Sequence, residues 1–266
     1  MPELPEVEVV IRRLRPEAVG VRITGIDVFR PRVIYPQKPD DLAKLKGKQI
    51  EAIDRRGKNI IIRLTGGLAC RIHLGMNGNL LIIPDARLHT PATRVLVKLR
   101  GGRGLAFEDY GAMAIFQLHS GEELEAKLGK LGVEPLTRAF TKTFLIEAAK
   151  RSMRPIKPFL MNQGIIAGIG NIYAAESLFE AKIHPEKPAN RVTRQKLEAL
   201  HAAIPKVLRR AIRDALKTYS RPGRHQGMHF HVYGRKGDPC HVCGKPIRNM
   251  QQDGRTTYFC AHCQRK

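Results

Sequence analysis

Residues 48–74 read KQIEAIDRRGKNIIIRLTGGLACRIHL and contain three strand-like runs in close succession. The runs cover 48–56, 59–64 and 68–74, and glycine-containing turn sequences separate them. Similar short runs occur at 22–29, 78–84 and 94–100. Their short, regular spacing predicts a β-sandwich or a β-barrel for this part of the chain.

Helical patterns flank this β-rich region. In the segment 6–18, apolar residues recur at helical spacing, and Pro5 stands where a first-turn proline is tolerated. From about residue 119 the pattern becomes mainly helical and ends in a long run at 193–217. Residues 219–236 are rich in Gly, Arg and His without periodicity, so we expect a loop there that leads into a small cysteine module.

The composition indicates a folded protein with a polyanionic partner. The 266 residues are 42% hydrophobic, which is too much for a disordered basic tail. Lys and Arg number 47 against 24 Asp and Glu, a formal charge of +23, and 151–266 alone holds 22 basic and 7 acidic side chains. The alternatives are a solvated basic surface and binding to an anionic membrane. Membrane binding would need a basic helix with an aromatic face, but only 6% of residues are aromatic and none is Trp.

No membrane-spanning or secretion segment is predicted. No apolar run approaches about 20 residues, and the start MPELPEVE has neither a basic flank nor an apolar stretch. We therefore expect a cytoplasmic, nucleoid-associated protein without a membrane partner. We also expect a monomer.

Four of the five cysteines form the pattern C-x2-C-x16-C-x2-C, made by Cys240, Cys243, Cys260 and Cys263. This spacing is typical of a four-thiolate zinc site without an open coordination position, so we expect one structural Zn²⁺. A redox dithiol is the alternative, which two matched pairs disfavour. The fifth cysteine, Cys70, lies in the apolar stretch LACRIHL and is predicted to be core.

The N-terminal sequence MPELPE suggests a second kind of chemistry. Initiator methionine is normally removed before a small residue, which would leave the secondary amine of Pro2 at the terminus. An α-amine has a pKa near 8, so a nucleophilic neutral fraction exists, and the adjacent Glu3 is a candidate proton donor. The alternative is a plain helix start, with acidic residues such as Glu6 at the positive end of the helix dipole.

Several motifs along the whole chain resemble one family. They are MPELPEVE at the terminus, RRGKNI at 55–60, HLGMNG at 73–78, AGIGNIYAAESLF at 167–179, IHPEKPA at 183–189, VYGRKGDPC at 232–240 and the four cysteines. Together they resemble the formamidopyrimidine-DNA glycosylase and endonuclease VIII (Fpg/Nei) family, and are closer to Fpg.

The resemblance implies an α+β fold in three parts. An N-terminal two-layered β-sandwich flanked by helices (1–125) would carry the chemistry. A helix-two-turns-helix domain (126–230) and a zinc-finger β-hairpin (231–266) would follow. Double-stranded damaged DNA would lie in the cleft between the catalytic and DNA-binding parts, with the lesion nucleotide flipped out.

The implied activity is that of a bifunctional glycosylase and apurinic/apyrimidinic-site (AP) lyase. Pro2 would attack C1′ of an oxidised nucleotide, such as a formamidopyrimidine or 8-oxoguanine, to form an imine. Glu3 would donate a proton, and β,δ-elimination would nick the strand. The alternatives are a Nei-like preference for oxidised pyrimidines and a non-catalytic zinc protein that binds damaged DNA.

Three further residues resemble phosphate-contacting members of the family. Lys58 resembles the catalytic-domain lysine beside the lesion phosphate; otherwise it would be a surface-strand lysine. Asn171 resembles the asparagine that binds a flanking phosphate. It could also be a plain N-cap, and both roles can hold together. Arg255 resembles the finger arginine that grips phosphates around the flipped nucleotide, and Glu6 resembles a supporting carboxylate.

Met76 resembles the apolar residue that fills the space left by the extruded base. Without the resemblance, a lone methionine would be read as core. The family's usual DPRRFG segment is replaced here by FEDYGAM at 107–113, which lacks the intervening basic residues. Tyr110 in that segment is the candidate DNA-contacting residue.

Overall fold

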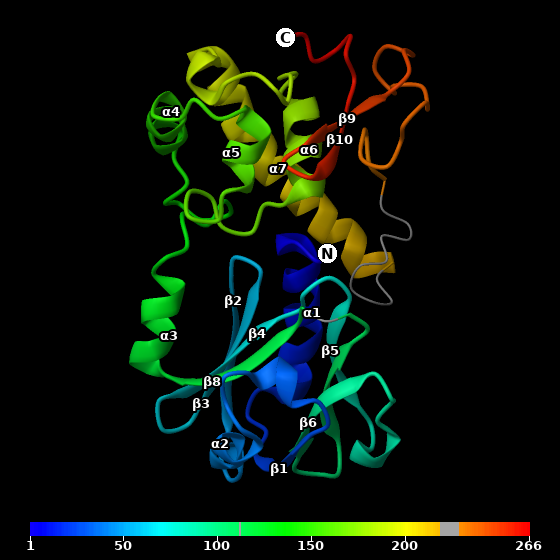
Figure 1. The fold of residues 1–266 in the computed structure, drawn as a ribbon. Coiled ribbons are helices and arrows are strands. Elements are labelled where there is room, and N and C mark those ends of the chain that lie inside the picture. Colours follow the sequence, from blue (N-terminus) through cyan, green and yellow to red (C-terminus); the bar gives the residue numbers. More distant parts are fainter. Residues whose placement is uncertain (112, 219–228) are drawn as a thin grey trace. The chain divides into compact units, whose positions relative to one another are not determined.

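The computed structural model describes residues 1–111, 113–218 and 229–266. The chain divides into two compact units (Figure 1). Unit 1 contains Met1–Lys130 and a short stretch that begins at Ala215, and unit 2 contains Leu131–Asp214 and the segment that runs to Lys266. The loop predicted for 219–236 lies partly outside the described residues. Within the described ranges, no helix has the length and apolarity needed to cross a membrane.

Unit 1 is built on two four-stranded antiparallel sheets, which confirms the sandwich prediction. One sheet has the order β1-β6-β7-β5 and the other has the order β2-β3-β4-β8. The strands of the first sheet are β1 (Ile23–Val28), β6 (Thr93–Leu99), β7 (Gly104–Asp109) and β5 (Gly78–Ile83). Those of the second are β2 (Ile50–Arg56), β3 (Asn59–Leu64), β4 (Leu68–His73) and β8 (Ile115–Ser120).

Two of these strands, β7 and β8, are not among the runs predicted from the sequence. In β7, the acidic residue Glu108 is buried and accepts a hydrogen bond from the Thr90 hydroxyl at 2.8 Å. In β8, the buried Gln117 accepts a hydrogen bond from Arg71 at 2.8 Å. Because polar side chains can be buried once the fold supplies partners, they interrupt the apolar alternation on which strand prediction depends.

Helix α1 (Leu4–Ala18) packs on strands of both sheets. It contacts β2, β3 and β5, and its buried face includes Leu4, Val7, Ile11 and Leu14. Burial of each such side chain stabilises the folded state by roughly 1.5–3 kcal/mol. The helix predicted for 6–18 is therefore confirmed, and it begins two residues earlier. Cys70 is also buried, as predicted, and burial raises the pKa of its thiol to about 12.

The remaining helical elements of unit 1 are short. They are η1 (Pro31–Ile34), α2 (Pro39–Leu42), η2 (Ala43–Leu45), η3 (Ala86–Leu88) and α3 (Gly121–Leu128). Helix α3 begins with a capping box, in which the Ser120 hydroxyl accepts from the backbone of Glu123 and the Glu123 carboxylate accepts from the backbone of Ser120. This confirms the helical pattern expected from about residue 119.

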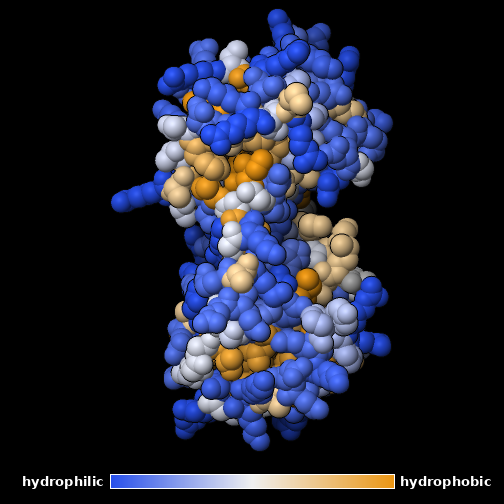
Figure 2. Space-filling model, turned by 60° about the vertical axis from the view of Figure 1, so that its left-hand side comes forward, coloured by the Kyte–Doolittle hydropathy of each residue, from blue (hydrophilic) through white to orange (hydrophobic). Residues whose placement is uncertain are grey.

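Unit 2 is helical and ends in a β-hairpin. Its elements are α4 (Lys142–Lys150), α5 (Ile156–Met161), α6 (Asn171–Glu180), η4 (Ala189–Arg191), α7 (Arg194–Thr218), β9 (Arg248–Gln252) and β10 (Arg255–Phe259). The last residues of α7 are grouped with unit 1. The visible face in Figure 2 is mainly hydrophilic with separate apolar patches, as expected for a chain with this basic excess.

Candidate active site and metal centre

Pro2 and Glu3 directly precede α1, and both are buried. Glu3 is the N-cap residue, and its backbone carbonyl accepts the first helical hydrogen bond from Val7 at 3.1 Å. The fully buried Glu6 carboxylate accepts a hydrogen bond from the backbone N–H of Glu3 at 2.8 Å. The chain entering the helix is therefore held in place directly beside the predicted nucleophile and proton donor.

Two contacts orient α1 along strand β2. The Arg55 guanidinium binds the Glu8 carboxylate at 3.1 Å. Two helical turns further on, Arg15 donates to the carbonyl of Ile53 at 2.7 Å. Burial opposes ionisation of Glu8, but hydrogen bonds and charges from Arg12 and Arg55 hold its pKa below the ordinary value. The helix and the strand thus run in opposite directions, and the N-terminal end of α1 lies toward the β2–β3 turn.

Lys58 lies in that β2–β3 turn. The turn has two residues because Arg56 pairs with Asn59, and the Asn59 side chain donates to the carbonyl of Arg56 at 3.1 Å. Asn59 also pairs with His73 at the end of β4. Lys58 therefore shares one end of the sheet with the β4–β5 loop, which carries Met76.

The loop that follows β7 reaches the same end of unit 1. Gly78 at the start of β5 pairs with Asp109 at the end of β7, so Met76 and Tyr110 occupy neighbouring loops. Figure 1 shows the start of α1, the β2–β3 turn and the β4–β5 loop at one end of the unit. The fold thus gathers all the candidate residues of unit 1, which are Pro2, Glu3, Lys58, Met76 and Tyr110.

His73 also belongs to this end and was missed in the sequence. Its Nδ1 accepts a hydrogen bond from the backbone N–H of Gly75 at 3.1 Å. Burial, followed by the charges of Lys58 and Arg71, lowers its pKa from 6.5 to about 4. The imidazole is therefore neutral at neutral pH. The available signal was a histidine at the end of a predicted strand, close to basic residues.

We expect His73 to make folding stability depend on pH between 6.5 and about 4. The unfolded chain binds this proton near pH 6.5, whereas the folded chain binds it only near about 4. The folded state therefore has its full stability with respect to His73 above pH 6.5. It loses stability as the pH falls toward 4, because the unfolded chain takes up this proton first. The loss should be about 3 kcal/mol of the free energy of unfolding, at about 1.4 kcal/mol for each unit of pKa difference. Denaturant titrations of wild type and His73→Gln over this range measure it, because glutamine keeps an acceptor for Gly75 but does not titrate. Equal pH slopes in the two proteins would contradict the assignment.

In unit 2, Asn171 is the first residue of α6, and Gly170 is the N-cap. The alternative of a plain N-cap is therefore wrong. The Asn171 side chain instead donates to the backbone carbonyl of Thr256 at 3.0 Å and accepts from the Lys157 ammonium at 2.5 Å. Asn171 thus links the start of α6 to the β9–β10 hairpin.

Lys157 on α5 is a second residue that the sequence analysis missed. Its side chain is only 1% exposed, and besides Asn171 its ammonium donates to the Thr257 hydroxyl at 2.8 Å. A buried ammonium is costly without polar partners, so these contacts hold the two segments in a defined arrangement. The one available signal was a lone lysine in the apolar run IKPFLM.

Arg255 begins β10, directly after the hairpin turn. Asp253 and Gly254 both have positive φ, at 49° and 69°, as a two-residue type I′ turn requires. Arg255 pairs with Gln252, and its own side chain is exposed. The hairpin therefore presents this guanidinium to solvent.

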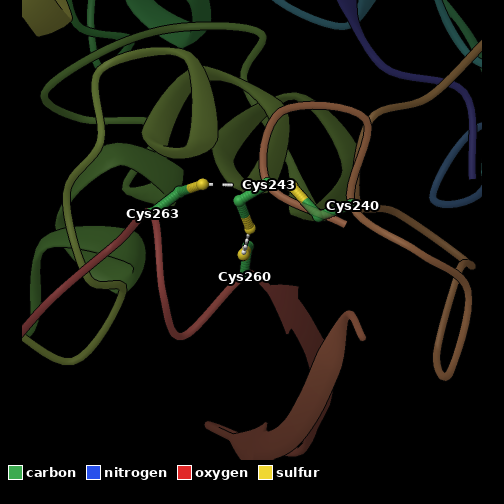
Figure 3. A group of neighbouring side chains, drawn as sticks. All are labelled: Cys240, Cys243, Cys260 and Cys263. Atoms are coloured by element: carbon green, nitrogen blue, oxygen red, sulfur yellow. Dashed lines mark hydrogen bonds between the residues drawn. The ribbon is translucent and has the colours of Figure 1, made fainter. Parts of the chain in front are cut away.

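The four module cysteines converge on one point (Figure 3). Their sulfur atoms lie within 4.8 Å of one another, with Sγ distances of 3.9 Å for Cys240–Cys263 and 3.6 Å for Cys243–Cys260. These distances exclude a disulfide. A tetrahedral zinc with bonds of about 2.3 Å separates its sulfurs by about 3.8 Å, so the donor set fits Zn²⁺.

The surroundings of the cluster also suit a closed structural site. Burial and the neighbouring thiols raise the pKa of Cys263, so forming its thiolate costs free energy without a nearby positive charge. A bound dication stabilises the thiolate and removes this cost. Cys240 and Cys260 pack with Val232 and Ile247 in one small apolar cluster. The module therefore binds one structural zinc, and the predicted hairpin between the cysteine pairs is confirmed as β9 and β10.

Comparison with family models divides the chain into three matched segments. Residues 1–114 match the formamidopyrimidine-DNA glycosylase N-terminal domain, and 131–221 match the formamidopyrimidine-DNA glycosylase H2TH (helix-two-turns-helix) domain. Residues 237–265 match the zinc finger found in FPG and IleRS.

Individual proteins match over the full length. The formamidopyrimidine-DNA glycosylase of Gluconobacter oxydans is 40% identical, with 100% of both chains covered. That of Chloroflexus aggregans is 39% identical, with 99% of this chain and 98% of the relative covered. Lactococcus lactis Fpg in complex with N7-benzyl-Fapy-dG DNA has a TM-score of 0.92 at 33% identity, covering 100% of both chains. The same enzyme with abasic-site DNA has a TM-score of 0.91 at 34% identity, covering 99% of this chain and 100% of that one.

Proposed function

Because this chain belongs to the formamidopyrimidine-DNA glycosylase family and is a DNA glycosylase of base-excision repair, we propose that Pro2 is its nucleophile and that it is also an AP lyase. The observation that carries the proposal is the first turn of α1. There Pro2 and Glu3 are buried, and the backbone N–H of Glu3 donates to the Glu6 carboxylate. The proposed substrates are formamidopyrimidines and 8-oxoguanine in duplex DNA.

The proposed chemistry needs a neutral amine and a proton donor. After removal of Met1, the Pro2 nitrogen forms a bond to C1′, and the glycosidic bond breaks with its electron pair on the departing base, which takes up a proton. The Pro2 nitrogen then loses its N–H proton and Glu3 donates a proton to the sugar ring oxygen. The C1′–O4′ bond breaks as the nitrogen lone pair forms the iminium between Pro2 and C1′. Loss of a C2′ proton then expels the 3′ phosphate, and a second elimination expels the 5′ phosphate.

Two cationic residues and one amide are proposed to bind phosphate. Lys58 in unit 1, and Asn171 and Arg255 in unit 2, are the assigned contacts, since amide and cationic donors at turns and helix starts suit anions. Much of the affinity should be independent of the lesion and should fall with salt, because binding releases counterions from DNA. The excess of +15 in residues 151–266 supports this role for unit 2.

Trapping with sodium borohydride tests the proposal. The reagent reduces the iminium to a stable amine, so incubation with a duplex containing 8-oxoguanine or an abasic site should leave a covalent protein–DNA adduct on Pro2. A panel with formamidopyrimidine, thymine glycol and dihydrouracil ranks the lesions. Adducts only with the last two would favour a Nei-like preference, and no adduct with any lesion would overturn the catalytic assignment.

We expect Lys157→Met to weaken DNA binding about tenfold or more, since hydrogen bonds to a charged group contribute about 1.5–3 kcal/mol. The methionine keeps the buried volume but releases Asn171 and Thr257, so the proposed phosphate contact loses its orientation. Anisotropy titrations with a duplex carrying a tetrahydrofuran abasic-site analogue measure the affinity. Lys150→Met, on the exposed face of α4, removes the same charge and is the matched control. Equal losses in the two variants would mean that only net charge matters.

The remaining assignments are part of the same proposal. We propose the three-part division at 1–125, 126–230 and 231–266, a monomeric state and a cytoplasmic location. The damaged duplex is the partner of both units. Gel filtration with light scattering tests the oligomeric state directly.

A further inference from the structure

A surface cavity lies in unit 1 outside the candidate active-site residues. Its volume is about 300 Å³, at the lower end of the range for small-molecule sites. Two segments line it, namely Phe29 and Arg30, which directly follow β1, and several residues of 89–94, which lead into β6. The backbone N–H of Phe29 donates to the carbonyl of Arg94 at 2.8 Å, so strand pairing continues into the cavity wall and holds the two segments together.

The cavity adjoins the end of the sheet that carries a candidate DNA-contacting residue, Tyr110. The hydroxyls of Thr90 and Tyr110 both donate to the buried Glu108 carboxylate, at 2.8 and 3.0 Å. Arg94 donates to the backbone carbonyl of Asp109 at 2.6 Å. One carboxylate therefore connects the cavity wall to Tyr110, and a DNA strand bound near Tyr110 can place a neighbouring nucleotide in the cavity.

An aromatic pair forms one wall of the cavity. The rings of Phe29 and His89 stack with centroids 4.7 Å apart and planes inclined by 18°. Phe29 is 41% exposed, His89 is also exposed, and the His89 Nδ1 lies 3.3 Å from the carbonyl oxygen of Ala86. The pair thus presents aromatic surface to solvent in a fixed orientation. Such surface is what an unstacked nucleobase binds, because every base has a π-face.

The charged part of the lining is cationic. The half-buried Arg94 guanidinium is fixed by hydrogen bonds to the carbonyls of Pro91 at 3.1 Å and Asp109 at 2.6 Å. Arg30 is exposed on the neighbouring segment. Among the described residues, none that carries a carboxylate lines the cavity. Two guanidinium groups in such a lining attract an anion, and their planar donor geometry matches a phosphate.

We propose that this cavity is a nucleotide subsite, in which an unpaired base of DNA stacks on the Phe29–His89 pair and its phosphate binds Arg30 and Arg94. The aromatic face and the guanidinium groups match the two parts of a nucleotide. A paired base inside a duplex has both faces covered by its neighbours, so the subsite takes a nucleotide at a strand end or in a single-stranded stretch. The inference goes beyond the proposed excision chemistry and rests on the proposed function only in taking DNA as the source of the nucleotide.

Occupation of the subsite can be measured without a lesion. The probe is an undamaged duplex that ends in one unpaired 2-aminopurine nucleotide, whose fluorescence falls when the base stacks on an aromatic ring. The wild-type protein should quench this fluorescence and bind the probe about tenfold more tightly than the same duplex with a blunt end, which is the scale of one stacked base. Equal affinity for the two duplexes without quenching would overturn the subsite.

Phe29→Ala tests the aromatic wall. It should abolish the quenching and the preference for the unpaired end, while the affinity for the blunt duplex stays unchanged. Phe29→Tyr should restore both readouts, because it returns an aromatic ring. Tyr35→Ala removes a more exposed ring (76%) that does not line the cavity and is the matched control. Equal losses in Phe29→Ala and Tyr35→Ala would show that the Phe29–His89 pair is not the stacking surface.

Arg30→Gln tests the phosphate contact. The extra affinity for the unpaired end should fall, and the salt dependence of binding to this probe should decrease by about one released ion. Arg32→Gln, in the exposed part of η1, removes the same charge outside the cavity and is the matched control. Equal changes in the two variants would show that net charge, and not a contact from Arg30, sets the affinity.

A free nucleotide offers the same base and phosphate, so dGMP is titrated separately and followed by saturation-transfer NMR. Binding of dGMP that depends on Phe29, without quenching of the unpaired 2-aminopurine, would mean that the cavity takes free nucleotides and that its assignment to a DNA strand is wrong. Quenching of the probe in a protein that gives no borohydride adduct with any lesion would instead overturn the proposed chemistry and leave the subsite in place.

Discussion

Base excision is expected to fall by at least about 10³-fold when the Pro2 amine is blocked or replaced, the scale of losing a positioned nucleophile and its proton transfer. The sharpest change is an added lysine between Met1 and Pro2, which prevents removal of Met1 and turns the Pro2 nitrogen into an amide. Proline stays in the chain, but its nitrogen is no longer nucleophilic. Pro2→Gly keeps an amine but removes the buried ring that positions it, so it should also lose activity.

Glu3→Gln should cost about 10²–10⁴-fold in excision, because glutamine keeps the shape of a general acid but cannot donate its proton. Glu3 is only 3% exposed, and its backbone bond to Glu6 does not depend on the carboxyl group, so the helix start should survive. Single-turnover excision from an 8-oxoguanine duplex measures both effects. Pro16→Ala and Glu17→Gln, at the exposed end of the same helix, are the matched controls. Full activity in the protein with a blocked Pro2 nitrogen would show that Pro2 is not the nucleophile. Full activity in Glu3→Gln would show that Glu3 is not the proton donor.

Cys260→Ser is expected to abolish zinc binding and with it the folded hairpin and DNA affinity. Metal binding supplies about 10 kcal/mol or more to modules of this kind, which have too little apolar core to fold alone. Here the apolar cluster around the cysteines is small and consists of Val232, Cys240, Ile247 and Cys260 with Ala175 and Phe179 of α6. The loss should extend to Arg255 and to Thr257, the hairpin partner of Lys157. Zinc content by atomic absorption and anisotropy with abasic-analogue DNA measure the outcome.

Cys70→Ala is the control for the loss of a thiol. Cys70 is buried in β4 of unit 1, and its thiol is protonated because burial raises its pKa to about 12. This variant should keep one zinc per chain and unchanged DNA affinity. If Cys260→Ser retains full DNA affinity after its zinc is gone, the module is not part of the binding surface.

Much of the fold was predictable from local patterns. The helix at the N-terminus, six of the strands and the zinc hairpin follow from periodicity, turn residues and cysteine spacing. Strands β7 and β8 escaped because Glu108 and Gln117 are buried with partners from distant segments. The N-cap interpretation of Asn171 was wrong because Gly170 takes that position and the asparagine side chain bonds to Lys157 and Thr256 instead.

The sequence by itself determined the order of the motifs, the metal ligands and the candidate nucleophile, because each depends on residues close together in the chain. Only the tertiary structure decided which residues far apart in the chain come into contact. Lys157 meets Thr257 across 100 positions, and His73 lies near enough to Lys58 for its pKa to fall to about 4. Gly75 meets Met113 because two strand ends share one edge of the fold. Such contacts arise from strand pairing and core packing, which place distant residues together without leaving a local pattern.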